Sequence, residues 1–146
     1  DEEIALLAAS ETVGVVIPTE NFNGGKTQFA PARKLIDAGC AVALTTDYNP
    51  GSAPCPSQPM AMAIACRYQK LLPAEALNAA TINAAHAIGL GETHGSIEVG
   101  KRADLKFLDS CDWRMLVYEF GGNLIAETLA EGRPVERNKE KVLGDK

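Results

Sequence analysis

Asp47 is the residue of this sequence best placed to do chemistry, because it ends an apolar run and begins a turn. The run covers residues 41–46, and an uninterrupted apolar stretch of this kind predicts a strand buried on both faces, as in parallel sheets covered by helices. In barrels of alternating strands and helices, catalytic groups stand at the C-terminal ends of strands. A carboxylate at such a position can coordinate a metal or move a proton.

The loop after Asp47 contains Asn49, Gly51 and Ser52, and we expect it to line a pocket. An Asn amide and the backbone N–H groups of a glycine turn can approach an anionic substrate closely. Taken alone, Asp followed by Asn-Pro-Gly is more often a turn former than a ligand, so this reading stays open at this point.

The segments before the turn predict one crossover unit. Residues 2–10 indicate a helix, and residues 13–18 a second strand buried on both faces. Residues 19–27 are polar and indicate a loop. Residues 31–39 predict a helix that Gly39 ends. Strand, loop, helix and strand in this order predict a right-handed unit with parallel strands.

Helices and then short strands are predicted after the turn. The first helix covers residues 58–71, and Met60 and Met62 are expected to pack in the core. The second begins at Pro73, with Glu75 near its positive end. The third covers residues 81–91 and is capped by Thr81 or its neighbour. From Gly95 onward the pattern indicates a turn at 96–101, a strand at 103–109 and a hairpin at 124–135 around Glu131-Gly132.

Composition excludes several classes of protein. The chain has 146 residues, 46% of them hydrophobic, which suits one domain with a sizeable core. A net charge of -5 and the lack of a long basic cluster argue against a nucleic-acid partner. No apolar stretch reaches the roughly 18 residues of a membrane helix, so we expect a cytoplasmic protein without a membrane partner. The four cysteines are widely spaced and are expected to be free thiols.

Four stretches carry a resemblance to a known superfamily: residues 46–52, 73–77, 81–85 and 95–105. Together they resemble the C-terminal part of a metal-dependent amidohydrolase. Within that superfamily, the Asp-x-Asn-Pro-Gly turn is similar to that of the imidazolonepropionase family. Enzymes of that family act in histidine degradation and open the ring of 4-imidazolone-5-propanoate to give N-formimidoyl-glutamate.

The resemblance implies an α/β fold made of the C-terminal part of a TIM-like (β/α)8 barrel and strands of a small composite β-sandwich. Residues 1–94 would be barrel, with residues 13–18 and 41–47 as its last two strands. Residues 95–137 would belong to the sandwich, and residues 138–146 would form a charged tail.

The resemblance also implies roles for the turn. Asp47 would be a ligand of one catalytic zinc or iron and would take a proton from water, while Asn49, Gly51 and Ser52 would hold the substrate. His86 and His94 do not stand at ligand positions, and a catalytic zinc needs about three protein ligands. We therefore expect the isolated chain to be inactive, with its other ligands in a missing N-terminal part of the barrel.

Two alternatives remain open. One keeps the fold and changes the substrate to another cyclic amide or to a deaminase substrate. The other is a non-catalytic module that associates with itself, because two barrel strands alone leave unpaired backbone at their edges. We expect the edges of residues 13–17 and 41–46 to be covered by the missing part of the barrel or by a second copy, and a homodimer.

Overall fold

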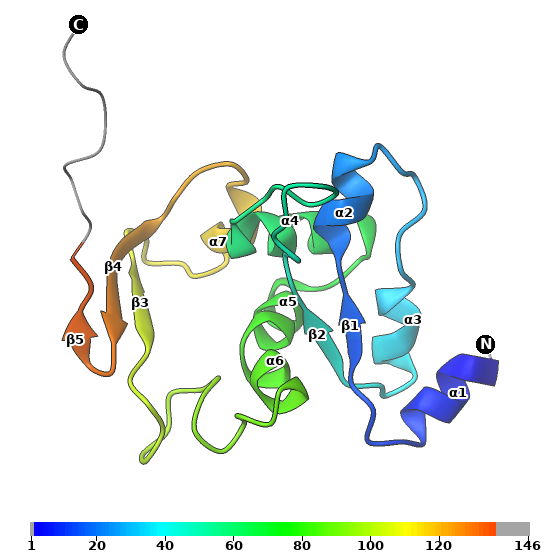
Figure 1. Ribbon diagram of the computed structural model, residues 1–146, viewed down its shortest axis with the longest axis horizontal. Helices are drawn as coiled ribbons and strands as arrows, with labels where there is room; N and C mark the ends of the chain where they lie inside the picture. The colour runs from blue at the N-terminus through cyan, green and yellow to red at the C-terminus, as the bar shows by residue number, and fades with distance from the viewer. Residues whose placement is uncertain (1, 137–146) are drawn as a thin grey trace, which may run out of the picture.

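A parallel strand pair carries the predicted turn. In the computed structural model, which describes residues 2–136, β1 (Gly14–Val16) pairs in parallel with β2 (Val42–Leu44), with Gly14 opposite Val42 (Figure 1). The chain passes between the two strands through α2 (Pro18–Asn23) and α3 (Ala32–Asp37), and α1 (Glu2–Ala8) packs on α3. The predicted parallel pairing is confirmed. The predicted tail at 138–146 lies outside the described residues.

Three helices follow the turn, close to their predicted positions: α4 (Gln58–Tyr68), α5 (Pro73–Ala80) and α6 (Ile82–Ala87). The Ser57 hydroxyl caps α4 by accepting a hydrogen bond from Met60 N at 3.3 Å. At the start of α5, Glu75 Oε2 accepts from Leu72 N at 2.7 Å, which satisfies a backbone donor that has no partner within the helix. Thr81 occupies the N-cap position of α6, as predicted, but its hydroxyl donates back to Leu77 O at 2.7 Å and makes no capping bond.

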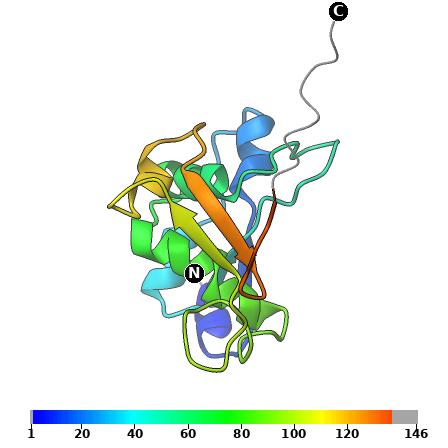
Figure 2. The ribbon, with the colours of Figure 1, turned by 90° about the vertical axis from the view of Figure 1, so that its left-hand side faces the viewer.

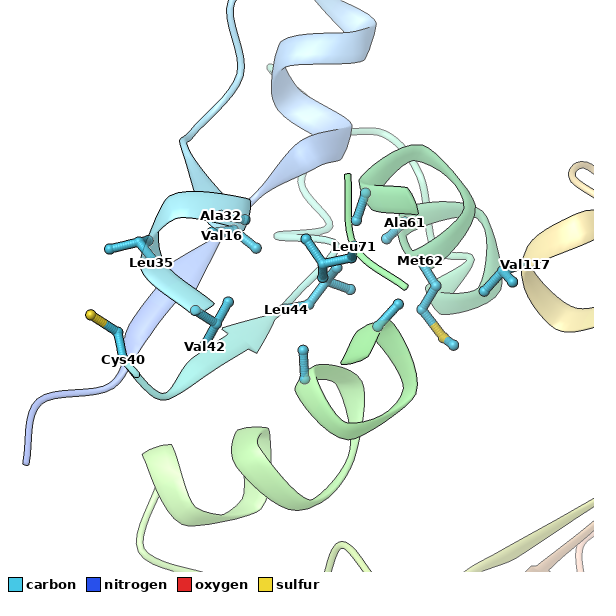
Figure 3. Close-up of a cluster of buried hydrophobic side chains, with 13 residues drawn as sticks. Val16, Ala32, Leu35, Cys40, Val42, Leu44, Ala61, Met62, Leu71 and Val117 are labelled. Atoms are coloured by element: carbon cyan, nitrogen blue, oxygen red, sulfur yellow. The ribbon is translucent and has the colours of Figure 1, made fainter. Parts of the chain in front are cut away.

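The core is built around β2, whose three residues are each only 2% exposed. The buried cluster around β2 includes small side chains of α4 and α5, Ala61, Ala65, Ala76 and Ala79, together with Met62. Figure 3 shows Ala61 and Met62 in this cluster. Alanine lets a helix approach a strand closely, and methionine fills the irregular space that remains. The prediction that this strand is buried on both faces is confirmed.

The same prediction is wrong for β1, where Val16 is buried but Val15 is 54% exposed. Within residues 2–136, β2 is the only strand that pairs with β1. The Val15 side chain points to a face that no element of this part of the chain covers. Only one face of β1 is therefore buried.

The loop predicted over residues 19–27 is also wrong in its first half, where α2 forms. Pro18 occupies the first turn, where its fixed backbone angle suits a helix, and Glu20 lies near the positive end. The helix ends at Asn23, and Gly25 follows with a φ of +62°, a conformation that glycine adopts at little cost.

A three-stranded antiparallel sheet forms at one end of the molecule (Figures 1 and 2). It contains β3 (Leu105–Leu108), β4 (Ile125–Ala130) and β5 (Arg133–Pro134). Glu131 and Gly132 join β4 to β5 with φ values of +53° and +75°, as two-residue hairpin turns require. The predicted hairpin is confirmed, whereas the second layer that a sandwich needs stays a prediction.

A short helix that the sequence did not indicate, α7 (Met115–Tyr118), connects this sheet to the core. It packs on α4, and Val117 is buried there. The Arg67 guanidinium donates to Val117 O at 2.8 Å and to Tyr118 O at 3.0 Å. Residues 95–136 therefore do not stand apart from the helical region.

No helix within residues 2–136 is long and apolar enough to cross a membrane. All four cysteines are free thiols, as predicted.

Candidate functional site

Asp47 lies beyond the C-terminal end of β2, and its side chain is exposed. Its φ of +47° places it in the left-handed region, which is unusual for a residue with a side chain, although Asp and Asn tolerate it best. The Thr45 hydroxyl accepts a hydrogen bond from Asp47 N at 3.1 Å. The chain thus turns within three residues of the end of the buried strand.

Asn49 organises the turn and brings all four predicted site residues together. Its Oδ1 accepts hydrogen bonds from Gly51 N at 2.9 Å and Ser52 N at 2.8 Å. Its Nδ2 donates to Asp47 O at 2.7 Å and lies 3.3 Å from the carboxylate oxygen Oδ2. A Cβ added to Gly51 would lie 3.3 Å from Asn49 Oδ1, so glycine suits this close approach.

This geometry differs in one respect from the expectation that backbone N–H groups of the turn are free to meet a substrate. The N–H groups of Gly51 and Ser52 point at one oxygen, that of Asn49. Two neighbouring N–H groups that converge in this way form a small concave site suited to an anionic oxygen. An oxygen of a ligand reaches both donors when it takes the place of the Asn49 side chain.

The described residues contain no group of three or more His, Cys, Asp or Glu side chains that could hold a metal ion. Both histidines lie elsewhere: His86 is exposed on α6, and His94 Nδ1 is 2.7 Å from the Thr93 hydroxyl. His94 Nε2 is also 3.8 Å from Asp104. Asp47 can therefore supply one ligand or accept a proton, but residues 2–136 alone do not fit a catalytic metal centre.

Two side chains of α2 also contact the turn, and sequence reasoning missed both. Thr19 Oγ1 donates to Thr46 O at 2.7 Å, and Asn23 Nδ2 donates to Ser52 O at 3.0 Å. Pro18 followed by Glu20 is a pattern typical of a helix start and could have predicted α2. The polar residues and glycines that follow favoured a loop instead.

The strand below the turn is fixed from its outer edge by two side-chain amides. Gln58 Nε2 donates to Leu44 O at 3.0 Å, and Asn83 Nδ2 donates to Val42 O at 2.8 Å. Further out, Arg33 Nη1 of α3 lies 2.7 Å from Glu75 Oε2 of α5, and this ion pair lowers the pKa of the Glu75 carboxyl. The strand below the turn is therefore bonded by side chains from α4 and α6, and the ion pair joins α3 to α5.

Comparison with known proteins agrees with this geometry. The profile of the amidohydrolase family matches residues 1–136. The chain belongs to the amidohydrolase family. It is 56% identical over 138 residues to an imidazolonepropionase of Herpetosiphon aurantiacus, an alignment that covers 94% of this chain and 32% of that relative. It is 53% identical over 133 residues to an imidazolonepropionase of Chloroflexus aggregans, covering 91% and 31%.

Solved structures of amidohydrolase enzymes share the fold. An adenosine deaminase from Xanthomonas campestris, solved with bound zinc, superposes with a TM-score of 0.81 at 29% identity, covering 91% of this chain and 34% of that one. These matches confirm the barrel fold of the family as the parent architecture. The chain spans about a third of the length of the curated relatives that it matches.

Proposed function

We propose that this amidohydrolase chain supplies one section of the active site of an imidazolonepropionase, which hydrolyses the ring C–N bond of 4-imidazolone-5-propanoate to give N-formimidoyl-glutamate. The observation that carries the proposal is the Asp47 carboxylate just past the end of a buried parallel strand, joined by Asn49 to the Gly51-Ser52 turn. The two relatives described above, more than half identical to this chain, carry the name of that enzyme.

In this proposal Asp47 is both a metal ligand and the proton acceptor. An exposed carboxylate at a strand end can take a proton from an attacking water and pass it to the leaving ring nitrogen. Asn49, Gly51 and Ser52 bind the substrate, and the paired N–H groups of Gly51 and Ser52 suit the propanoate carboxylate.

The metal, zinc or iron, would supply Lewis-acid chemistry to the assembled enzyme. A catalytic zinc needs about three protein ligands, so the rest must come from outside residues 2–136. The missing part of the barrel is therefore the partner that the proposal requires. The homodimer, the cytoplasmic location and the β-sandwich stay predictions from the sequence.

A chimaeric enzyme tests the proposal. This chain replaces the matching third of the Herpetosiphon aurantiacus relative, and hydrolysis of 4-imidazolone-5-propanoate is followed together with metal content. We expect turnover, and we expect Asp47→Asn to lower kcat by about a thousandfold or more, since a positioned acid or base is commonly worth 10²–10⁴. The matched control is Asp109→Asn, because Asp109 is exposed beyond the end of β3.

Full activity of the Asp47→Asn chimaera would contradict the assigned role. Because the adenosine deaminase structure resembles this chain, adenosine, as a deaminase substrate, and other cyclic amides are assayed in parallel. A chimaera that acts on one of these and not on the imidazolone would favour the deaminase or cyclic-amide alternative. A chain that forms oligomers by itself, yields an inactive chimaera and binds no metal would favour the non-catalytic module.

A further inference from the structure

The helix α2 presents two donors to the turn from positions one helical turn apart. Residues four apart lie on the same face of a helix, so Thr19 and Asn23 point toward the same neighbour. Thr19 reaches the carbonyl of Thr46, the residue before Asp47, and Asn23 reaches the carbonyl of Ser52. The two bonds therefore bracket the whole segment from Asp47 to Ser52.

Apart from these bonds, the turn is held mainly by its own hydrogen bonds. Asp47, Gly51 and Ser52 are exposed, and Asp47 has a left-handed backbone that persists only where its surroundings fix it. Ala53, directly after Ser52, is fully buried and accepts a hydrogen bond from Asn49 N, while a hollow of about 220 Å³ lies between α2, α4 and residues 54–55. The two hydrogen bonds from Thr19 and Asn23 thus tie α2 directly to both ends of the turn.

The two donors differ in burial. Thr19 is one of two buried polar residues among those described, at 2% exposed, and its hydroxyl sits at 2.7 Å from the backbone carbonyl next to Asp47. Asn23 is exposed, and its bond closes the other end of the turn. Thr19 therefore bonds the backbone next to Asp47, and Asn23 bonds the other end of the turn, which carries the Gly51 and Ser52 N–H groups.

We propose that Thr19 and Asn23 are positioning residues of this site: Thr19 orients the Asp47 carboxylate, and Asn23 sets the spacing between that carboxylate and the substrate-binding end of the turn. The inference rests on the proposed function for its kinetic consequences. Neither residue touches the reacting atoms, and each acts through one backbone carbonyl.

The two roles predict different kinetic effects in the chimaeric enzyme. Thr19→Val keeps the shape of the side chain and removes the hydroxyl, so we expect kcat and metal affinity to fall by about tenfold or more, the size usual for partners that orient ligands. Thr19→Ser restores the donor and should recover both. Asn23→Asp replaces the donor with an acceptor that repels Ser52 O, so KM should rise by about tenfold with kcat nearly unchanged.

Asn21 offers a matched control on the same helix. Its Nδ2 donates to Gln28 O at 2.6 Å, so it holds the following loop and does not contact the turn. Asn21→Asp adds the same charge as Asn23→Asp, two residues away, and should leave KM unchanged. An equal rise of KM in both variants would overturn the proposal, as would a Thr19→Val enzyme that keeps its kcat, or a Thr19→Ser enzyme no better than Thr19→Val.

Hydrogen exchange separates this proposal from the proposed function. In the unaltered chain, the amides of Gly51 and Ser52 should exchange slowly, and Asn23→Asp should speed their exchange by about tenfold while Asn21→Asp does not. This measurement needs no turnover. An inactive parent chimaera with this exchange pattern would refute the imidazolonepropionase activity and keep the positioning role, whereas no difference in exchange between the two variants would refute the positioning role.

Discussion

The strand β3 lies in the sheet at one end of the molecule, whereas the strand β2 lies nearer the middle among the helices, and the two differ in how far they are buried (Figure 1). All three residues of β2 are buried beneath helices, whereas β3 has two exposed and two half-buried residues. The sheet containing β3 has no buried residue on any strand. The turn that carries Asp47 thus follows the more deeply buried of the two strands.

The sequence explains this contrast. The helices around β2 are dense in alanine, so they approach the strand closely enough to exclude water from both of its faces. The strand β3 alternates apolar and polar side chains, which suits a sheet with one covered face. Phe107 shares a face with Leu105 and is still 49% exposed, so even the apolar face of β3 is only partly covered. A catalytic turn gains from the first arrangement, because a packed base limits how far its side chains move.

The largest expected effect comes from shortening matched leucines in the two regions. Leu44→Ala in β2 should lower the free energy of unfolding by about 2–5 kcal/mol, because it leaves a cavity in a packed core. Leu108→Ala in β3 should cost about 1 kcal/mol, since the half-buried side chain loses less contact. Urea denaturation of both variants measures the difference. Equal losses would show that the two regions are equally packed.

A smaller effect is expected where the two regions meet. Arg67 also lies with its guanidinium 4.8 Å from the centre of the Phe120 ring. Arg67→Met removes the bonds to the α7 carbonyls and should cost about 1–3 kcal/mol of stability. Hydrogen exchange should show that α7 loses protection while α5 does not. Arg67→Lys keeps the charge but lacks the planar guanidinium that bonds both carbonyls, so it should recover only part of the lost stability. Full recovery would show that the charge alone causes the effect.

The smallest expected effect is a pH-dependent one within the helical region. Arg33 lowers the pKa of Glu75, so the folded chain gains stability from the ionised carboxylate at pH values above its ordinary value of about 4.3, and loses it as the pH falls through the lowered pKa. Glu75→Gln keeps an oxygen for Leu72 N but not the charge. Its Tm should lie slightly below that of the unaltered chain at pH 7, by the equivalent of about 1 kcal/mol or less, and the two should converge in acid.

Asp37 provides the control for that measurement, because it pairs with the same arginine at 2.7 Å but is 64% exposed. Asp37→Asn should change Tm less than Glu75→Gln does. A gap between Glu75→Gln and the unaltered chain that stays constant down to pH 3 would show that the lost charge is not the cause.

Local signals in the sequence were enough to predict most of the helical region. The buried run of β2, the Pro73 helix start and the Glu131-Gly132 turn each follow from short-range chemistry, and the structure confirms all three. The closeness of Asp47 to Ser52 was also predictable, because the turn residues are adjacent in the chain.

The helix α2 had a local start signal in Pro18, but the errors at β1 and α7 arose where distant contacts decide the local structure. The helix α7 is stabilised by Arg67, which lies 50 residues earlier in the chain, and nothing within residues 115–118 records that contact. The exposure of Val15 depends on what covers its outer face, which the pattern of β1 itself does not contain. The hydrogen bonds of α2 to the turn likewise join segments 27 and 29 residues apart.

The amides of Asn83 and Gln58 change what the free edge of β2 offers to another strand. Odd-numbered backbone groups of this strand face β1, as the bond from Gly14 N to Ala41 O shows, so the carbonyls of Val42 and Leu44 face the opposite edge. Both already have donors. An arriving strand would therefore have to displace these two side-chain amides before it could bond the carbonyls, and it would add hydrogen bonds at this edge only through the N–H groups of Val42 and Leu44.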